Sequence, residues 1–197
     1  MYYTWVEADD THMTDEDAAR LVQKGDRERF GILVERYEEK LLRYGRKFLS
    51  RSEDIEDIVQ EVFMSCYQNL QSFDTTQKFS PWIYRIAHNA FVNGLRKQKR
   101  SPLVFVDFDA LLAHPVYEDP VPLEREQAEV KKMIEKCLDT LSPKYREVLA
   151  LYYLEELSYK EISDIIQVPT GTVGIRIKRA KEALKTAYEE LNPDHGA

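Results

Sequence analysis

The sequence predicts an all-α protein of two helical domains joined by a flexible linker. Apolar residues recur at intervals of three and four in both halves of the 197-residue chain, the period of helices that bury one face. The first half lacks the alternation of apolar and polar residues that indicates strands. Four prolines and a cluster of acids interrupt the helical pattern at 101–123. We therefore expect domains at 14–100 and 124–191, the linker at 101–123, and tails at 1–13 and 192–197.

The first domain is predicted to contain four helices. Their expected N-caps are Thr14, Asp26, Ser52 and Ser80. Acidic residues follow Thr14, where they complement the helix dipole, and Gly25 is expected to end this first helix. Pro81 suits the first position of the fourth helix, and the polar residues 72–79 before it predict a loop.

The second domain is predicted to begin with a helix at 124–141. Ser142 followed by Pro143 indicates the start of the next helix, which is expected to reach about residue 155. Ser158 and Glu161 have the spacing of a capping box and open a short helix that ends at 167–169. Thr170 is the expected cap of a final helix that continues to about residue 191.

The charge of the chain is unevenly distributed. A net charge of −7 by itself argues against nucleic-acid binding, because Lys and Arg drive the attraction to phosphate. Basic residues nevertheless gather in two stripes at 85–100 and 172–185, whereas acids gather at 107–129. Two such stripes, each at the end of a predicted helical unit, favour two contacts with a polyanion over two solvated helix faces.

Several classes of protein are not favoured. Cys66 and Cys137 lie among apolar residues without a CxxC or Cys/His cluster, so we expect buried, reduced thiols and neither a metal nor another cofactor. The chain shows no signal peptide and no apolar stretch near the ~20 residues that span a bilayer, so we expect a cytoplasmic protein without membrane insertion. The four histidines are scattered and no phosphate loop is evident, so we expect no enzyme activity.

Residues 158–185 have the plan of a helix-turn-helix: a short helix, a turn, and a longer helix with basic residues near its start. The second helix of such a unit fits the major groove and brings its first residues to base edges. The residues expected to face DNA are Thr170, Thr172, Gly174, Ile175, Arg176, Lys178 and Arg179. An ordinary helical hairpin is the alternative interpretation.

Several segments resemble the extracytoplasmic-function (ECF) family of bacterial sigma factors. Residues 158–162 (SYKEI), 168–173 (VPTGTV) and 141–148 (LSPKYREV) are similar to the family's domain that binds the promoter −35 element. Residues 54–63 (DIEDIVQEVF), 79–89 (FSPWIYRIAHN) and 23–30 (QKGDRERF) resemble segments of its N-terminal domain. The resemblance implies a factor that binds core RNA polymerase and directs promoter-specific initiation, under the control of stress and of an anti-sigma factor.

The resemblance also implies functional residues. The family's helix at 54–63 docks on the clamp helices of the polymerase β′ subunit, which assigns that contact to Asp54, Asp57, Gln60 and Glu61. Carboxylates there suit basic partners, although acids on a helix often only solvate it. The β flap is the second polymerase element that the family contacts.

The family holds the melted −10 strand with the helix that begins near Trp82 and the loop before it. The residues at those positions are Trp82, Arg85, Asn89, Asn93, Arg96, Lys97, Lys99 and Arg100. Asn89 stands at the family's base-reading position, and the cations at 96–100 suit phosphates. Trp82 is alternatively a core residue, since it is the first apolar residue of an amphipathic helix.

Two features are particular to this chain. Family members place Lys or Arg and then Ser where this chain has Gly174 and Ile175, so we expect a different −35 preference, part of which rests on DNA shape. In the linker, Asp107, Asp109, Glu118 and Asp119 are expected either to imitate nucleic acid in the polymerase cleft or to solvate a spacer.

Two rival functions stay open at this point. A helix-turn-helix regulator with a sensory N-terminal half would bind duplex DNA without polymerase. An enzyme would use Asp54, Asp57 and Glu61, which share one helix face, as a metal site, although carboxylates alone are a weak signal.

Overall fold

The structure is a computed structural model that describes residues 13–100, 133–134 and 136–191. Every regular element in these residues is a helix, which confirms the all-α class. The expected linker at 101–123 lies outside the described residues, as do nearly all of both tails and much of the helix expected at 124–141.

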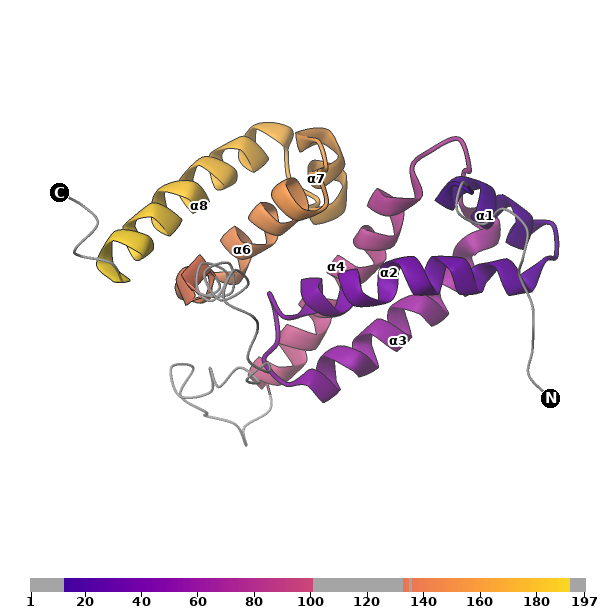
Figure 1. Cartoon of the computed structure of the whole chain (residues 1–197), viewed down its shortest axis with the longest axis horizontal. Coiled ribbons are helices and arrows are strands. Elements are labelled where there is room, and N and C mark those ends of the chain that lie inside the picture. The colour runs from indigo at the N-terminus through magenta and orange to yellow at the C-terminus, as the bar shows by residue number, and fades with distance from the viewer. Residues whose placement is uncertain (1–12, 101–132, 135, 192–197) are drawn as a thin grey trace, which may run out of the picture.

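The N-terminal half contains α1 (Asp15–Gln23), α2 (Phe30–Gly45), α3 (Ser52–Asn69) and α4 (Phe79–Arg100), with 3₁₀ turns at Arg27–Arg29 and Leu70–Ser72. The helices α2, α3 and α4 pack together, and α1 closes one end of this bundle against α2 and α4 (Figure 1). Large side chains at helical spacing fill the core, and burying each stabilises the fold by about 1.5–3 kcal/mol. They include Leu33, Leu41, Val62, Ile83, Tyr84 and Phe91.

The C-terminal half contains α6 (Pro143–Leu149), a π-helical turn (Ala150–Leu154), α7 (Tyr159–Ile166) and α8 (Thr170–Leu191), preceded by helical residues at 133–134 and 136–140. The α-helix expected to reach about residue 155 thus ends at Leu149. The amide of Glu155 bonds to the carbonyl of Ala150, five residues earlier, and Glu156 then reverses the chain with φ 52°.

Three of the expected helix starts are confirmed. The Thr14 hydroxyl accepts a hydrogen bond from the Asp17 amide and caps α1. Ser142 precedes α6 with Pro143 at its first position. Ser158 and Glu161 form the reciprocal capping box of α7. Gly25 follows the end of α1 with a positive φ of 107°, which a residue without a Cβ adopts at little cost.

The other expected caps are wrong in detail. Asp26 makes no capping hydrogen bond and precedes the 3₁₀ turn rather than α2, and Ser52 is the first residue of α3. Thr170 lies inside α8, where the Pro169 carbonyl accepts the first helical hydrogen bonds.

The fourth helix begins at Phe79 rather than after Ser80. The amide of Phe79 donates to Oε1 of Glu16 in α1, at 2.8 Å. A side chain 63 residues earlier thus satisfies an amide at the start of α4, and no local pattern reveals it.

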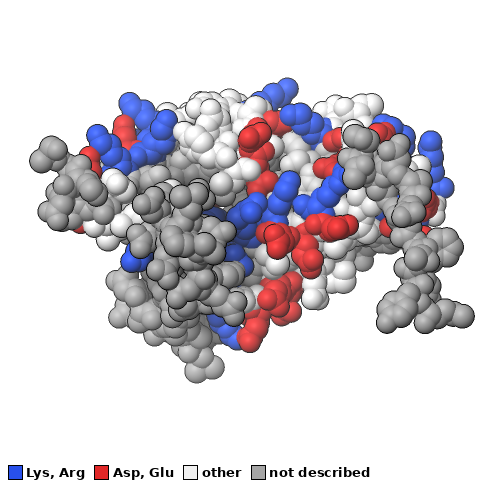
Figure 2. All heavy atoms as spheres, in the orientation of Figure 1, with Lys and Arg blue, Asp and Glu red and all other residues white. Residues whose placement is uncertain are grey.

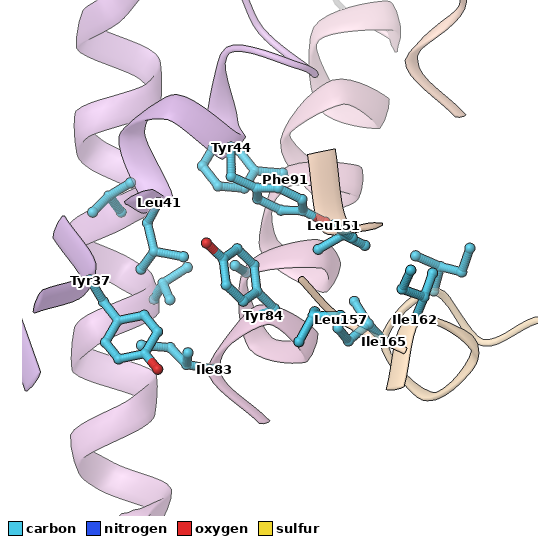
Figure 3. Close-up of a cluster of buried hydrophobic side chains, with 14 of the residues drawn as sticks. Tyr37, Leu41, Tyr44, Ile83, Tyr84, Phe91, Leu151, Leu157, Ile162 and Ile165 are labelled. Carbon is cyan, nitrogen blue, oxygen red and sulfur yellow. The ribbon is translucent and has the colours of Figure 1, made fainter. Parts of the chain in front are cut away.

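The two halves pack directly against each other. Helix α7 lies against α4, and the buried residues of both halves form one continuous apolar cluster (Figure 1). In Figure 3, Tyr44, Tyr84 and Phe91 from the N-terminal half face Leu151 and Leu157 from the C-terminal half. Both cysteines are free and buried, and burial raises the pKa of the Cys66 thiol to about 12.

Candidate polymerase and nucleic-acid interfaces

An acidic face runs along α3. Asp57, Gln60 and Glu61 are exposed and Asp54 is half-buried, whereas Ile55, Val59 and Val62 on the opposite side are buried. Figure 2 shows acidic side chains gathered in the lower middle of the view, the region that α3 crosses in Figure 1. The structure therefore brings the four residues assigned to the clamp contact onto one accessible face.

A cleft of about 330 Å³ lies between α3 and α4. Asn89 and Asn93 line it from α4, opposite Glu61 and Ser65 of α3. Arg85, Asn89 and Asn93 are all exposed and follow one another at intervals of four, so they share one face of α4. The cleft offers amide, hydroxyl and carboxylate groups that suit the edge of an unstacked base.

Trp82 belongs partly to the core. Its ring centroid lies 4.8 Å from that of Phe73 and 5.6 Å from that of Phe79, and its side chain is half-buried. The indole is thus held rigid by its neighbours, and part of it stays accessible. Both interpretations of this residue, as a core side chain and as a stacking surface, remain compatible with the geometry.

The loop before α4 is fixed to α1 rather than to the cleft. The side-chain amide of Gln23 donates hydrogen bonds to the backbone carbonyls of Leu70 and Phe73, at 2.8 Å each. Asp74 accepts hydrogen bonds from the amide and hydroxyl of Thr76, which hold the pKa of that carboxyl below its ordinary value. The residues that line the cleft come from α3 and α4, so the loop at 72–78, which the family resemblance places at the −10 site, does not border it.

The basic end of α4 extends from this cleft. Arg96 and Lys97 are exposed, and the backbone of Lys99 and Arg100 continues the helix. The side chains of Lys99 and Arg100 lie outside the part of the chain that the structure describes.

The helix-turn-helix is present at α7 and α8. Gln167 adopts the left-handed conformation, with φ 55°, and ends α7, so that α8 starts after a short turn. Val173, Ile177 and Ala180 are buried and hold α8 to the domain. Of the seven residues expected to face DNA, Thr170, Ile175, Lys178 and Arg179 are exposed, and Thr172, Gly174 and Arg176 are half-buried.

A polar network joins the two halves at Glu147, whose side chain is 5% exposed. Its Oε1 accepts a hydrogen bond from the Tyr44 hydroxyl at 2.6 Å and lies 2.6 Å from Nδ1 of His88. Burial, followed by the Glu147 carboxylate, raises the pKa of Tyr44 well above its ordinary value, so the phenol keeps its proton and donates it. Removing Glu147 would leave both the Tyr44 hydroxyl and the His88 ring without this acceptor.

Two ion pairs lie around this network. Lys78 Nζ is 2.8 Å from Glu161 Oε1, and Arg43 Nη2 is 3.7 Å from Glu155 Oε1. The Lys78 side chain is 72% exposed, so solvent screens the first pair and it contributes little stability. Local sequence does not reveal these contacts, because each residue looks like an ordinary solvated charge.

An apolar groove of about 500 Å³ crosses the C-terminal half beside α6 and α8. Ile134, Tyr153 and Leu154 line it and are 47%, 52% and 52% exposed. Lys47, Lys181 and Lys185 also border it. Exposed apolar groups in such a concave surface are typical of a contact with another protein.

The described residues contain no cluster of three or more His, Cys, Asp or Glu side chains placed to hold a metal ion. None of the helices that the structure describes is both long enough and apolar enough to cross a bilayer.

Comparison with known proteins accounts for this arrangement. Residues 33–101 match the family description "Sigma-70 region 2", and residues 131–184 match "Sigma-70, region 4". The chain is 35% identical over 178 residues to the ECF RNA polymerase sigma factor SigW of Bacillus subtilis (strain 168), which covers 86% of this chain and 94% of that protein. It is 34% identical over 187 residues to the ECF RNA polymerase sigma-E factor of Escherichia coli (strain K12), with coverage of 91% and 96%.

A solved structure shares the fold. The sigma factor RpoE, crystallised with the anti-sigma factor NepR from Bartonella quintana, has a TM-score of 0.65 and 24% identity, over 81% of this chain and 96% of that chain. The two matched regions coincide with the two halves that carry the candidate interfaces. The chain belongs to the ECF family of RNA polymerase sigma factors.

Proposed function

We propose that this ECF sigma factor directs core RNA polymerase to promoters through three separate surfaces. The acidic face of α3 binds the β′ clamp helices, α4 holds the melted −10 strand, and the start of α8 binds the −35 duplex. The observation that carries this proposal is the separation of charge: carboxylates face outward from α3, whereas cations gather at the end of α4 and the start of α8.

The −10 surface combines the groups that a single strand requires. Asn89 and Asn93 offer amides in a cleft, the half-exposed Trp82 offers a ring, and Arg96 and Lys97 lie further along the same helix. Stacking on a side-chain plane contributes about 1–3 kcal/mol per base, and cations attract the phosphates. Polymerase supplies the chemistry of RNA synthesis in this scheme.

The two halves separate when the promoter is bound. The −35 and −10 elements lie about 25 base pairs apart, which is roughly 85 Å at about 34 Å per ten base pairs. In the packed arrangement, α8 contacts α7 and α7 contacts α4. Neighbouring helix axes lie about 8–10 Å apart, so the two DNA-binding surfaces are far too close together to reach both elements. We infer that the packed form is the state of the free protein.

Two further partners belong to the proposal. The β flap of polymerase is assigned to the apolar groove beside α6 and α8, where exposed apolar side chains are available to a protein partner. An anti-sigma factor restrains the chain, an assignment supported by family membership. We further propose that the linker acids Asp107, Asp109, Glu118 and Asp119 act inside the polymerase cleft.

Reconstitution with core polymerase tests the clamp contact. Asp57→Lys reverses a charge in the centre of the acidic face, and like charges across an interface cost several kcal/mol, so affinity for core polymerase should fall at least tenfold. Glu39→Lys is the matched control, because Glu39 is also an exposed acid and lies on α2, away from this face. Equal loss in both variants would indicate general electrostatics rather than a contact at this face, and promoter binding without polymerase would favour a simple DNA-binding regulator.

The salt dependence of single-strand binding tests the −10 surface. Arg96→Ala combined with Lys97→Ala removes two exposed cations from the end of α4. Affinity for a single strand falls with salt, and each phosphate contact makes the slope of log affinity against log salt steeper by about 0.7. For holoenzyme on melted −10 DNA, the slope of the double variant should therefore be shallower by about 1.4. An unchanged slope would remove the end of α4 from the DNA contact.

A further inference from the structure

The outward face of α8 carries one large aliphatic side chain among charged ones. Ile175 is 55% exposed, while Val173 and Ile177, two residues away on either side, are buried. Helical residues are rotated by about 100° each, so Ile175 lies about 200° from both and points away from the core. Packing within the domain therefore does not explain an isoleucine at this position.

The neighbours of Ile175 make it protrude. Gly171 lies four residues earlier on the same helix face, and a Cβ built there would meet no atom within 4 Å. Gly174 precedes it, and a Cβ at that position would lie 3.5 Å from the ring of Tyr159. The Tyr159 ring thus covers Gly174, whereas Gly171 leaves bare backbone beside Ile175 at the start of the helix, so the helix can approach a groove floor closely there.

The surrounding charge identifies the class of ligand. Lys178 and Arg179 are exposed and Arg176 is half-exposed, all within four residues of Ile175. Lys178 Nζ lies 3.9 Å from Glu182 Oε1 in an exposed pair. An apolar surface of a partner protein would offer these cations no counter-charge, whereas the phosphates of duplex DNA pair with them. On the base edges of the major groove, the C5-methyl group of thymine is the apolar contact available to such a side chain.

We propose that Ile175 recognises a thymine in the −35 element by packing on its C5-methyl group. This inference rests on the proposed role of α8 in −35 binding. It adds that Ile175 determines which base is preferred at one base pair of that element. Arg176, Lys178 and Arg179 supply contacts to phosphates or guanines around it. A promoter with cytosine or with adenine at that strand position lacks the methyl group and binds more weakly.

Deoxyuridine, which lacks only this methyl group, provides the test. Holoenzyme assembled from the full chain and core polymerase first selects its preferred duplexes from a pool with a randomised −35 region. Each −35 thymine in a selected duplex is then replaced singly by deoxyuridine. The wild type should lose about fourfold in affinity at one thymine, the loss expected for one methyl group that is no longer buried.

Ile175→Ala should bind the thymine duplex about fourfold more weakly and should bind thymine and deoxyuridine equally at that position. Since Ile175 is exposed on a helix, this substitution leaves the fold intact. Leu191→Ala is the matched control: Leu191 is 44% exposed near the other end of α8. That variant should keep the wild-type discrimination.

Three results would overturn the inference. The first is that the selected duplexes contain no −35 thymine. The second is that no single replacement of thymine by deoxyuridine changes the affinity of the wild type. The third is that Ile175→Ala distinguishes thymine from deoxyuridine as the wild type does. In each case, binding that still depends on polymerase and on the −35 region would leave the proposed function standing. Loss of all promoter-dependent binding in the wild type would refute both.

Discussion

At the scale of single residues, Asn89 is the group whose chemistry is most specific. Its amide lies in the cleft between α3 and α4, exposed and accompanied by Asn93. We expect Asn89→Asp, which keeps the shape but replaces two donors with a negative charge, to weaken binding of melted −10 DNA by at least tenfold. A base contact of this type contributes about 1–3 kcal/mol, and repulsion from phosphate adds to the loss. Competition binding of holoenzyme to single-stranded −10 oligonucleotides measures the effect.

Gln68→Glu serves as the control for that experiment. It adds the same charge at an exposed position of α3 outside the cleft. If Asn89→Asp and Gln68→Glu behaved alike, general electrostatics rather than a local contact would explain the loss.

The residues of the site differ in how far the sequence could predict them. Asn89 stands in a contiguous motif and Arg176 follows another by three residues, so a sequence match is enough to locate them. Glu147 is different, because its partners His88 and Tyr44 lie 59 and 103 residues away. A glutamate in a short amphipathic helix resembles a solvated charge, and only the packing of two distant segments shows that it is buried.

At the scale of elements, the same distinction separates correct helix starts from wrong ones. Ser158 and Glu161 cap α7 from within four residues, and the sequence pattern predicts them. An N-cap at Ser80 predicts that helix α4 starts at Pro81, but it starts two residues earlier, at Phe79, because Glu16 of α1 accepts the Phe79 amide. Capping by a distant side chain depends on tertiary structure, so local propensity cannot reveal it.

We expect Glu16→Ala to destabilise the N-terminal half by about 1 kcal/mol, the usual effect of losing a helix cap. For a chain of this size that loss lowers Tm by about 2–4 °C. Glu28→Ala, which alters an exposed acid of the neighbouring 3₁₀ turn, should shift Tm by less. Thermal melts followed by circular dichroism compare the two, and equal shifts would argue against the cap.

The start of α7 should respond to acid. Burial opposes ionisation of Glu161, but hydrogen bonds from Lys78 and Ser158 outweigh it and hold the pKa of this carboxyl below its ordinary value. Because the pKa is lower in the folded state, the ionised carboxyl stabilises the fold at pH values above the pKa of the unfolded state, about 4.3. This contribution is lost as pH falls through the pKa of the folded state. Urea unfolding of wild type and Glu161→Gln should therefore differ most above pH 5 and converge toward pH 3.

The control for the acid response is Asp164→Gln, an exposed carboxylate on the same helix. Its difference from wild type should change less with pH. A constant difference between wild type and Glu161→Gln across this range would contradict the assigned network.

At the scale of the whole molecule, helical periodicity predicts which faces are buried but not what covers them. Tyr44 of α2 and Tyr84 of α4 are both buried. Part of what covers them is the other half of the chain, with Leu151 and Leu157 in the same cluster (Figure 3). Two domains that each appear complete in sequence therefore share one core in the packed form.

This shared core makes the balance between packed and separated halves adjustable at Glu147. Glu147→Ala leaves the Tyr44 hydroxyl and the His88 ring without their acceptor in the packed form, at a cost of about 1–3 kcal/mol. Water hydrates the same groups once the halves separate, so the equilibrium should shift toward the separated form by about five- to 150-fold. We expect a larger radius of gyration in small-angle X-ray scattering and tighter binding of the free protein to −35 duplexes.

Tyr44→Phe should act in the same direction but more weakly, since Glu147 keeps its contact with His88. Glu190→Ala, at an exposed position near the end of α8, should leave both measurements unchanged. A direct effect on α8 would raise DNA affinity without changing the radius of gyration, whereas separation of the halves changes both together. If Glu147→Ala left the radius of gyration at the wild-type value, packing of the two halves would not control access to the promoter.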